Sequence, residues 1–303
     1  MQHPTAVIDF GTNTARLLIG YRAPSGSIVP LLVKRQITRL GGGFSREIGI
    51  SREAEMRSIA ALRDFAGEIR KHAVSRVRAV ATSAVRDAAN GEGFCAAMYR
   101  ETGIRLEVID SREEGLLTLR GVLAGIDDPQ GDFLVFDVGG GSTEYTLTRQ
   151  GEPVFTDSLP LGVVRLTEGK REPEAMGDKI FRELSVLSKK LDVVGFLGSL
   201  AGVTLVGTAG TATTLAAISL KMTDYDYRLV NNHILSLAEI RDIFRTLLPM
   251  TPEERLRVPG LEKGREDLII AGIMITVKTM EMFGFQHLKV SDFGLLEGLL
   301  LSV

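Results

Sequence analysis

The stretch that decides the fold is Leu134-Val-Phe-Asp-Val-Gly-Gly-Gly-Ser-Thr143, an apolar strand that ends in an aspartate, glycines and small hydroxylated residues. It repeats the opening of the chain, Val7-Ile-Asp-Phe-Gly-Thr-Asn-Thr14, and Asp137 stands 128 positions after Asp9 (137 minus 9). In each copy the turn is followed by further strand-like sequence, so the segment reads as a hairpin. An internal repeat on this scale predicts two domains built on the same plan.

Predicted strands and helices alternate along the rest of the chain, which is the order found in α/β proteins. After the first hairpin, Ser51 precedes apolar residues at helical spacing and reads as the N-cap of an amphipathic helix. The second half ends in a predicted helix over residues 265–282 and a closing strand at 288–292. A polar breaker, Asp127-Asp-Pro-Gln-Gly131, interrupts the alternation and marks a domain junction near residue 125.

The composition is that of a folded protein with no general affinity for polyanions. Its 303 residues include 36 Lys and Arg against 38 Asp and Glu, and this net charge of -2 does not recruit nucleic acid or an anionic membrane. The single cysteine, Cys95, excludes an intrachain disulfide, and the first residues do not read as a signal peptide, so we expect a cytoplasmic protein. Residues 193–220 carry no charge, but five glycines and five threonines among them indicate a strand, a glycine turn and a helix rather than a membrane span.

The two aspartate-tipped turns are suited to binding phosphate beside a metal ion. Glycine lets main-chain N–H groups converge on one anion, and serine or threonine adds hydroxyl donors. Asp9 and Asp137 can only accept hydrogen bonds, so we expect them to hold magnesium or its waters rather than the phosphate itself. Either turn alone has a conformational explanation, but two copies without a P-loop motif favour phosphate chemistry. The candidate phosphate ligands are Gly11, Thr12, Asn13 and Thr14 in the first copy, and Gly139, Gly140, Gly141, Ser142 and Thr143 in the second.

A third glycine turn, Gly207-Thr-Ala-Gly210, precedes a helix predicted to begin near Thr211. Gly207 and Gly210 there either let an anion approach the helix N-terminus or let the helix pack closely on the preceding strand. Two arginines complete the candidate phosphate ligands: Arg16 follows the first turn, and Arg86 follows a predicted strand at 77–81. Either guanidinium suits bidentate phosphate binding, and either also suits a surface ion pair.

Seven strings in this order resemble the exopolyphosphatase and guanosine pentaphosphate phosphohydrolase family. That family belongs to the sugar kinase, Hsp70 and actin superfamily. The resemblance implies an α/β, actin-like fold with two ribonuclease H-like domains flanking a cleft: residues 1–125, with 291–303 packing back on them, and residues 126–290. The strings span residues 5–300 and are Asp9-Phe-Gly-Thr-Asn-Thr14, Ala81-Thr-Ser-Ala-Val-Arg-Asp-Ala88, Glu113-Glu-Gly115, Asp137-Val-Gly-Gly-Gly-Ser-Thr-Glu144, Gly207-Thr-Ala-Gly210, Gly264-Arg-Glu-Asp-Leu268 and Val290-Ser-Asp-Phe-Gly-Leu-Leu-Glu-Gly298.

The resemblance also implies an activity and roles for individual residues. The expected reaction removes the terminal phosphate from inorganic polyphosphate or guanosine pentaphosphate, with Mg²⁺ or Mn²⁺ as cofactor. Glu114 matches the glutamate that acts as general base or orients the attacking water, and Glu113 is the fallback. Without the resemblance, a solvated helix N-terminus is the preferred explanation of both carboxylates. Asp137, with Asp9, is expected to hold the metal, and Arg86 gains a catalytic assignment because its string matches the family.

Two other functions fit the same fold, because fold alone does not define function. One is a non-catalytic sensor that binds guanosine tetraphosphate, guanosine pentaphosphate or polyphosphate, and the other is a kinase with a specific acceptor. Larger family members continue into a helical extension, whereas this sequence ends after the second domain. We therefore expect short polyphosphates or a nucleotide polyphosphate to fit at least as well as long chains. The sequence does not distinguish a monomer from a homodimer.

Overall fold

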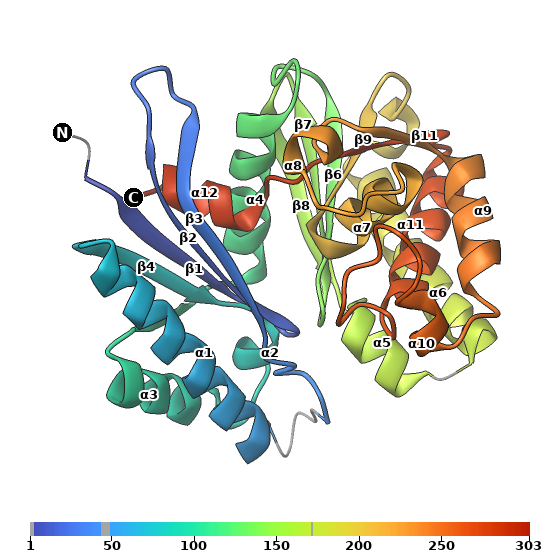
Figure 1. The fold of residues 1–303 in the computed structure, drawn as a ribbon. Helices are drawn as coiled ribbons and strands as arrows, with labels where there is room; N and C mark the ends of the chain where they lie inside the picture. Colours follow the sequence, from blue (N-terminus) through green and yellow to red (C-terminus); the bar gives the residue numbers. More distant parts are fainter. Residues whose placement is uncertain (1–2, 44–48, 171) are drawn as a thin grey trace. The chain divides into compact units, whose positions relative to one another are not determined.

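The computed structural model describes residues 3–43, 49–170 and 172–303, which form two compact units (Figure 1). Unit 1 comprises Met1–Ala124 and Gly294–Val303, and unit 2 comprises Gly125–Phe293. The chain therefore passes from one unit to the other at 124/125 and at 293/294, where the sequence analysis placed the boundaries at 125/126 and 290/291. Both chain ends belong to unit 1.

Unit 1 is built on a five-stranded sheet with the strand order β3-β2-β1-β4-β5. Strand β2 pairs antiparallel with both β1 and β3. Strands β1, β4 and β5 run parallel to one another. The predicted hairpin at residues 5–20 is thus confirmed as β1 and β2. The strands are β1 (Thr5–Phe10), β2 (Thr14–Arg22), β3 (Ile28–Ile37), β4 (Arg76–Ala81) and β5 (Leu106–Val108).

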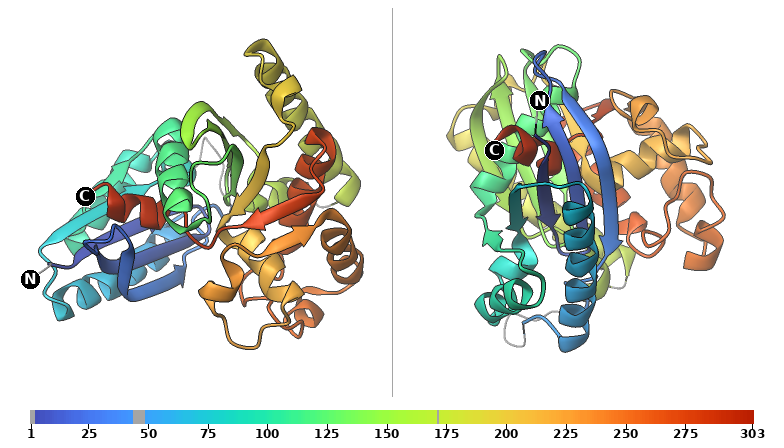
Figure 2. Two further views of the ribbon diagram at one scale, coloured as in Figure 1. Left: turned by 90° about the horizontal axis from the view of Figure 1, so that it is seen from above. Right: turned by 60° about the vertical axis from the view of Figure 1, so that its left-hand side comes forward.

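Helices cover both faces of this sheet (Figures 1 and 2). On one face, Ile8 and Phe10 of β1 pack in the core beneath α1 (Arg52–Lys71) and α3 (Gly91–Thr102). On the other, Val7 packs with α4 (Ser111–Gly125) and α12 (Leu295–Leu301). Because side chains alternate along a strand, Asp9 lies on the same face as Val7. The predicted N-cap is confirmed, since the Ser51 side chain accepts a hydrogen bond from the Ala54 N–H at 3.2 Å.

Unit 2 repeats this plan in a six-stranded sheet with the order β10-β11-β9-β6-β7-β8. Without the added strand β10, its order from β8 to β11 reproduces the order from β3 to β5 in unit 1. The internal repeat and the predicted α/β, actin-like fold with ribonuclease H-like domains are therefore confirmed. The strands are β6 (Phe133–Val138), β7 (Thr143–Arg149), β8 (Glu152–Leu159), β9 (Thr204–Thr208), β10 (Ile234–Ser236) and β11 (His287–Val290).

The core of unit 2 lies on the sheet face formed by Phe136 and Tyr145. The Tyr145 hydroxyl is 2.8 Å from the Thr279 hydroxyl of α11, which ties the central helix to the sheet. Asp137, one residue after Phe136, lies on the opposite face. The helices of this unit are α5 (Val163–Gly169), α6 (Pro173–Val193), α7 (Ala209–Ser219), α8 (Tyr227–Val230), α9 (Leu237–Leu247), α10 (Pro252–Arg255) and α11 (Ile269–Phe283).

The uncharged stretch 193–220 forms part of this core. It contains strand β9 and helix α7, whose residues Leu205 and Leu215 are almost fully buried in unit 2. The helix begins at Ala209, two residues before the predicted start at Thr211. Within the described ranges, the structure contains no helix with the length and apolar character that a bilayer crossing requires.

Candidate functional site

The two aspartate-tipped turns have the same local geometry. The Gly11 N–H donates to the Thr14 carbonyl at 3.0 Å, and the Gly139 N–H donates to the Ser142 carbonyl at 3.0 Å. A Cβ on Gly11 would lie 3.2 Å from the Thr14 oxygen, and one on Gly139 would lie 3.1 Å from the Ser142 oxygen. Both turns therefore leave little room for a side chain at this position, and the duplication extends to individual hydrogen bonds.

Neighbouring main chain occupies the carbonyl side of each turn. In unit 1, the Thr38 N–H donates to the Asn13 carbonyl at 3.0 Å and the Gly41 N–H donates to the Thr12 carbonyl at 2.8 Å. In unit 2, the Val164 N–H donates to the Gly140 carbonyl at 3.0 Å. With the carbonyl oxygens engaged in this way, the N–H side of each turn is the one suited to an anion.

The hydroxyls of the predicted turn residues have different surroundings. Thr12 Oγ1 lies 3.0 Å from Ser83 Oγ at the start of α2 (Ser83–Arg86), so the first turn is joined to the end of β4. Thr143 is fully buried, and its hydroxyl donates to the Leu161 carbonyl. The hydroxyl hydrogen of Thr143 is therefore committed inside unit 2, which leaves Ser142 as the better hydroxyl donor of the second turn.

Asp9 lies directly opposite Arg16 in the β1–β2 pair. Burial raises the pKa of the Asp9 carboxyl to about 6, although the nearby Arg16 guanidinium acts in the opposite direction. The cationic neighbour competes with a metal ion for the Asp9 carboxylate, which is mostly ionised at neutral pH because its pKa is about 6. The sequence-based assignment of Asp9 as a metal ligand stays a prediction.

The raised pKa of Asp9 predicts a pH-dependent stability. In the unfolded chain an aspartate titrates near 3.8, so between about pH 4 and pH 6 the folded protein binds more protons than the unfolded one. Stability contributed by protonated Asp9 is lost as the pH rises through about 6. We compare the free energy of unfolding of Asp9→Asn with that of the wild type by urea denaturation. The variant's value minus the wild-type value should increase by about 2 kcal/mol from pH 4 to pH 7. An equal difference at both pH values would contradict this.

Glu114 and Arg86 form an ion pair in which the Glu114 carboxylate is largely buried and the Arg86 side chain is 23 % exposed. The Arg86 Nη1 donates to Glu114 Oε2 at 3.0 Å and to the Ile109 carbonyl at 2.9 Å. Glu114 is 8 % exposed and lies in the first turn of α4, whereas Arg86 ends α2. These elements follow the C-terminal ends of the parallel strands β4 and β5, the edge of α/β sheets where ligands bind. The structure thus brings together two residues that are 28 positions apart and that the sequence analysis selected separately.

Glu113 has a different environment from its neighbour. Its carboxylate accepts a hydrogen bond from Arg78 Nη2 at 2.8 Å, and Arg78 also binds Glu107. The Glu113 side chain is 40 % exposed. Glu113 thus belongs to a surface charge network, and the geometry favours Glu114 as the residue that acts on a substrate.

Unit 2 places two carboxylates side by side at the second turn. Asp137 on β6 lies directly opposite Glu144 on β7 and Thr208 on β9, so the three side chains share one sheet face. Glu144 is 3 % exposed, and its Oε1 accepts a hydrogen bond from the Ser158 hydroxyl at 2.8 Å. The sequence analysis quoted Glu144 in a motif but gave it no role. The signal was a carboxylate near the start of a strand in which the next four residues, 145–148, are apolar or hydroxylated.

Asp137 and Glu144 fit a magnesium site. Mg²⁺ in enzymes is commonly held by one or two carboxylates, with water and substrate phosphates supplying the other ligands. Among the residues that the structure describes, no group of three or more His, Cys, Asp or Glu side chains is arranged to hold a metal ion without such help. This donor set therefore suits a metal that arrives with a phosphorylated substrate.

The two glycines of the third turn have different surroundings, and anion binding by this turn stays a prediction. A Cβ on Gly207 would lie 3.1 Å from both Ala212 and Leu288, so this glycine serves close packing of α7 and β11. At Gly210 in the first turn of α7, a Cβ would lie 1.4 Å from Nη1 of Arg265. The Arg265 guanidinium thus lies against the N-terminus of α7. Like Glu144, Arg265 is a candidate site residue to which the sequence analysis gave no role.

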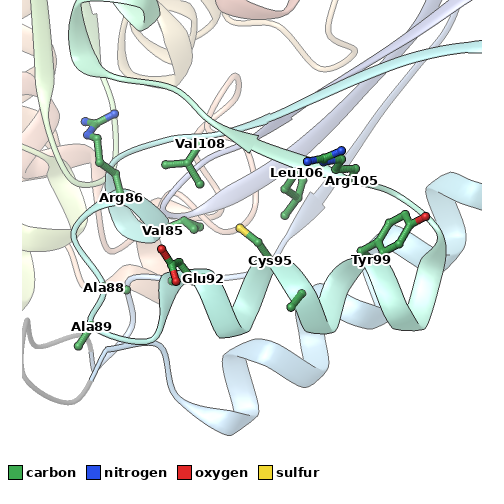
Figure 3. A pocket seen from close by; sticks show the side chains of 12 residues that line it. Val85, Arg86, Ala88, Ala89, Glu92, Cys95, Tyr99, Arg105, Leu106 and Val108 are labelled. Carbon is green, nitrogen blue, oxygen red and sulfur yellow. The ribbon is translucent and has the colours of Figure 1, made fainter.

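A pocket of about 890 Å³ lies between α3 and β5 of unit 1, with Arg86 among its lining residues. In Figure 3, the Arg86 guanidinium is turned away from Cys95 and Tyr99, which line the same pocket. Burial raises the pKa of the Cys95 thiol, which makes it less reactive. Arg86 lines this pocket as well as binding Glu114, whereas Glu114 itself does not line it.

Two sheets of repeated strand order, each with an aspartate-tipped glycine turn, define a protein with the actin-like fold. The sequence matches the Ppx/GppA phosphatase family over residues 21–303, and the chain belongs to this family. Exopolyphosphatase 2 of Mycobacterium tuberculosis is 33 % identical over 98 % of both chains. A guanosine-5'-triphosphate,3'-diphosphate pyrophosphatase of Aliivibrio fischeri is 26 % identical over 97 % of this chain and 58 % of its own. The Aquifex aeolicus PPX-GPPA enzyme is 35 % identical, with a TM-score of 0.80 and full coverage of both chains.

Proposed function

We propose that this protein is a phosphohydrolase that removes the terminal phosphate of inorganic polyphosphate or guanosine pentaphosphate by attack of water. The observation that carries the proposal is the buried Glu114, which is held by Arg86 at the edge of the sheet where the first glycine turn also lies. Family membership and the names of the relatives support the same reaction class. Inorganic polyphosphate is the first substrate to test, because the exopolyphosphatase relative matches along its whole length.

Phosphoryl transfer to water depends mainly on positioning and on neutralising the charge of the phosphoryl oxygens. In our proposal the N–H groups of Gly11 to Thr14 and of Gly140 to Thr143 bind substrate phosphates, and Arg16 adds a guanidinium. Glu114 orients the attacking water and accepts its proton. A carboxylate can accept several hydrogen bonds, so the bond from Arg86 fixes Glu114 without preventing it from binding water.

Asp137 and Glu144 are the proposed metal ligands. Magnesium, or manganese in its place, would supply positive charge to the phosphoryl oxygens. Asp137 lies at the end of its strand, and Glu144 is oriented by the Ser158 hydroxyl, so the two carboxylates present one anionic edge. Our proposal assigns no direct metal contact to the Asp9 carboxylate, which lies opposite Arg16.

The test is phosphate release from a panel of inorganic polyphosphate, guanosine pentaphosphate and ATP with a possible acceptor, with and without Mg²⁺. We expect release from at least one of the first two, abolished by EDTA and restored by Mg²⁺ or Mn²⁺. Asp137→Asn should raise the Mg²⁺ concentration needed for half-maximal rate by tenfold or more, in the range of about 1–3 kcal/mol for a lost charged contact. Tight guanosine tetraphosphate binding without any turnover would instead indicate a sensor, and acceptor-dependent ATP consumption would indicate a kinase.

A further inference from the structure

A pair of buried hydroxyls joins the first glycine turn to helix α2. Thr12 Oγ1 lies 3.0 Å from Ser83 Oγ, although the two residues are 71 positions apart in sequence. Thr12 is 7 % exposed and Ser83 is 4 % exposed. Ser83 begins α2, and Arg86, which binds Glu114, ends it. The pair therefore connects the turn proposed to bind phosphate with the element that holds the proposed water-binding glutamate.

Main-chain hydrogen bonds hold both ends of this connection without the help of the hydroxyls. The Gly41 N–H donates to the Thr12 carbonyl at 2.8 Å, and the Thr82 N–H donates to the Phe10 carbonyl at 3.3 Å. Within α2, the Arg86 N–H donates to the Thr82 carbonyl at 3.0 Å. Because none of these bonds uses a hydroxyl, the hydroxyl pair has a role other than placing the turn or the helix.

The pair holds one hydrogen more than its own hydrogen bond uses. Two hydroxyls carry two hydrogens, and the bond between Thr12 and Ser83 takes one of them. Among the residues that the structure describes, neither hydroxyl makes a further hydrogen bond. The second hydrogen is therefore available to an acceptor that belongs to a ligand. A phosphate oxygen is such an acceptor, and Thr12 lies in the turn whose N–H side is suited to an anion.

The direction of the bond decides which hydrogen the substrate receives. If Ser83 donates to Thr12, the hydrogen that is left belongs to the glycine turn, whereas the reverse leaves the hydrogen of Ser83 at the start of α2. Main-chain N–H groups of the turn flank Thr12, so a phosphate bound there selects the first arrangement. A hydroxyl that accepts a hydrogen bond is also the better donor, because linked hydrogen bonds polarise one another.

We propose that Ser83 is a positioning residue: its hydroxyl donates to Thr12 Oγ1 and directs the Thr12 hydroxyl hydrogen to an oxygen of the bound phosphate. This inference rests on the function proposed above and deepens it, because it adds a residue that acts on the substrate only through Thr12. Removal of the Ser83 hydroxyl then weakens the phosphate contact only while position 12 carries a hydroxyl. For substrate turnover, a purely structural serine has no such dependence on its neighbour.

The experiment is a double-mutant cycle in kcat/KM for inorganic tripolyphosphate, a chain so short that one phosphate contact is a large share of its binding. Ser83→Ala should lower kcat/KM about fivefold, as for a lost neutral hydrogen bond, and Thr12→Val about tenfold or more, as for a lost bond to a charged group. In the Thr12→Val background, Ser83→Ala should change kcat/KM by less than about twofold. In the Thr12→Ser background, which keeps the hydroxyl, the effect of Ser83→Ala should return.

Ser58→Ala is the matched control. Ser58 is fully buried in α1 and its hydroxyl donates to the Ala54 carbonyl at 2.7 Å, so the change removes one buried hydrogen bond that does not involve the turn. We expect kcat/KM within about twofold of the wild type. Ser83→Cys, which fills the same space with a much weaker donor, should behave like Ser83→Ala and replaces it if the alanine variant does not fold.

Dissociation constants for tripolyphosphate with Mg²⁺, measured by calorimetry in the Glu114→Gln background, separate this inference from the hydrolase proposal. A Kd about fivefold weaker with Ser83→Ala than with Ser58→Ala supports the inference even if the wild type releases no phosphate, in which case only the hydrolase proposal fails. If Ser83→Ala acts like Ser58→Ala, or has the same effect whether position 12 carries valine or serine, Ser83 does not position Thr12.

Discussion

Replacing Glu114 by glutamine should lower kcat for phosphate release by about 10²–10⁴, the usual contribution of a general acid or base. Glutamine has the shape of glutamate and can still accept the hydrogen bond from Arg86, but it cannot take a proton from water. Substrate binding should persist, because the phosphate ligands proposed in the glycine turns are untouched. The measurement is steady-state phosphate release with Mg²⁺, together with a Kd for the same substrate.

Glu113→Gln is the matched control, because it makes the same chemical change one residue earlier. Glu113 contacts Arg78 in an exposed network, and exposed ion pairs are worth roughly 0–1 kcal/mol. We expect kcat within twofold of the wild type and a similar melting temperature. Full activity in Glu114→Gln with loss in Glu113→Gln would exchange the two roles, and activity in both variants would remove the pair from the mechanism.

The contrast between these two glutamates shows where sequence reasoning ends. Adjacent residues on a helix point in directions about 100° apart, so a Glu-Glu pair gives no indication of which carboxylate faces the site. The decision comes from Arg86, which reaches Glu114 from another segment of the chain, and from Arg78, which reaches Glu113. Such choices depend on tertiary contacts that no local pattern contains.

The fold itself was largely predictable for a related reason. The hairpin with its aspartate-tipped turn depends on local sequence, and the repeat shows that signal twice, which fixed the two-domain α/β plan. Strand β3 was not predicted, although it pairs with β2 at the edge of the unit 1 sheet. Glu144 and Arg265 were likewise missed as site residues. Glu144 is significant because it pairs with Asp137 on the neighbouring strand. Arg265 is significant because it lies against Gly210 in the first turn of α7, 55 positions earlier in the sequence (265 minus 210).

Helix α12 illustrates a contact that depends on glycine on both sides. A Cβ on Gly298 would lie 1.8 Å from the Leu117 carbonyl oxygen of α4, and a Cβ on Gly121 would lie 1.8 Å from the Gly294 carbonyl oxygen. The obstructing atoms are main-chain atoms of a packed helix, which cannot rotate out of the way as a side chain can. The segment 294–303 is thus held on unit 1 by two helices in main-chain contact.

Gly298→Ala should therefore lower the free energy of unfolding by about 3 kcal/mol, the upper part of the range for overpacked cores. For a chain of 303 residues this corresponds to a fall in melting temperature of roughly 5 °C, measured by scanning calorimetry. Gly67→Ala in α1 is the control, because a Cβ there would meet no atom within 4 Å. Alanine at that helical position should stabilise by up to about 1 kcal/mol, since it costs less backbone entropy than glycine.

The same α4 carries Glu114, so Gly298→Ala should also lower kcat, whereas Gly67→Ala should not. Equal melting temperatures for the two variants would show that α12 does not pack on α4 as the structure has it.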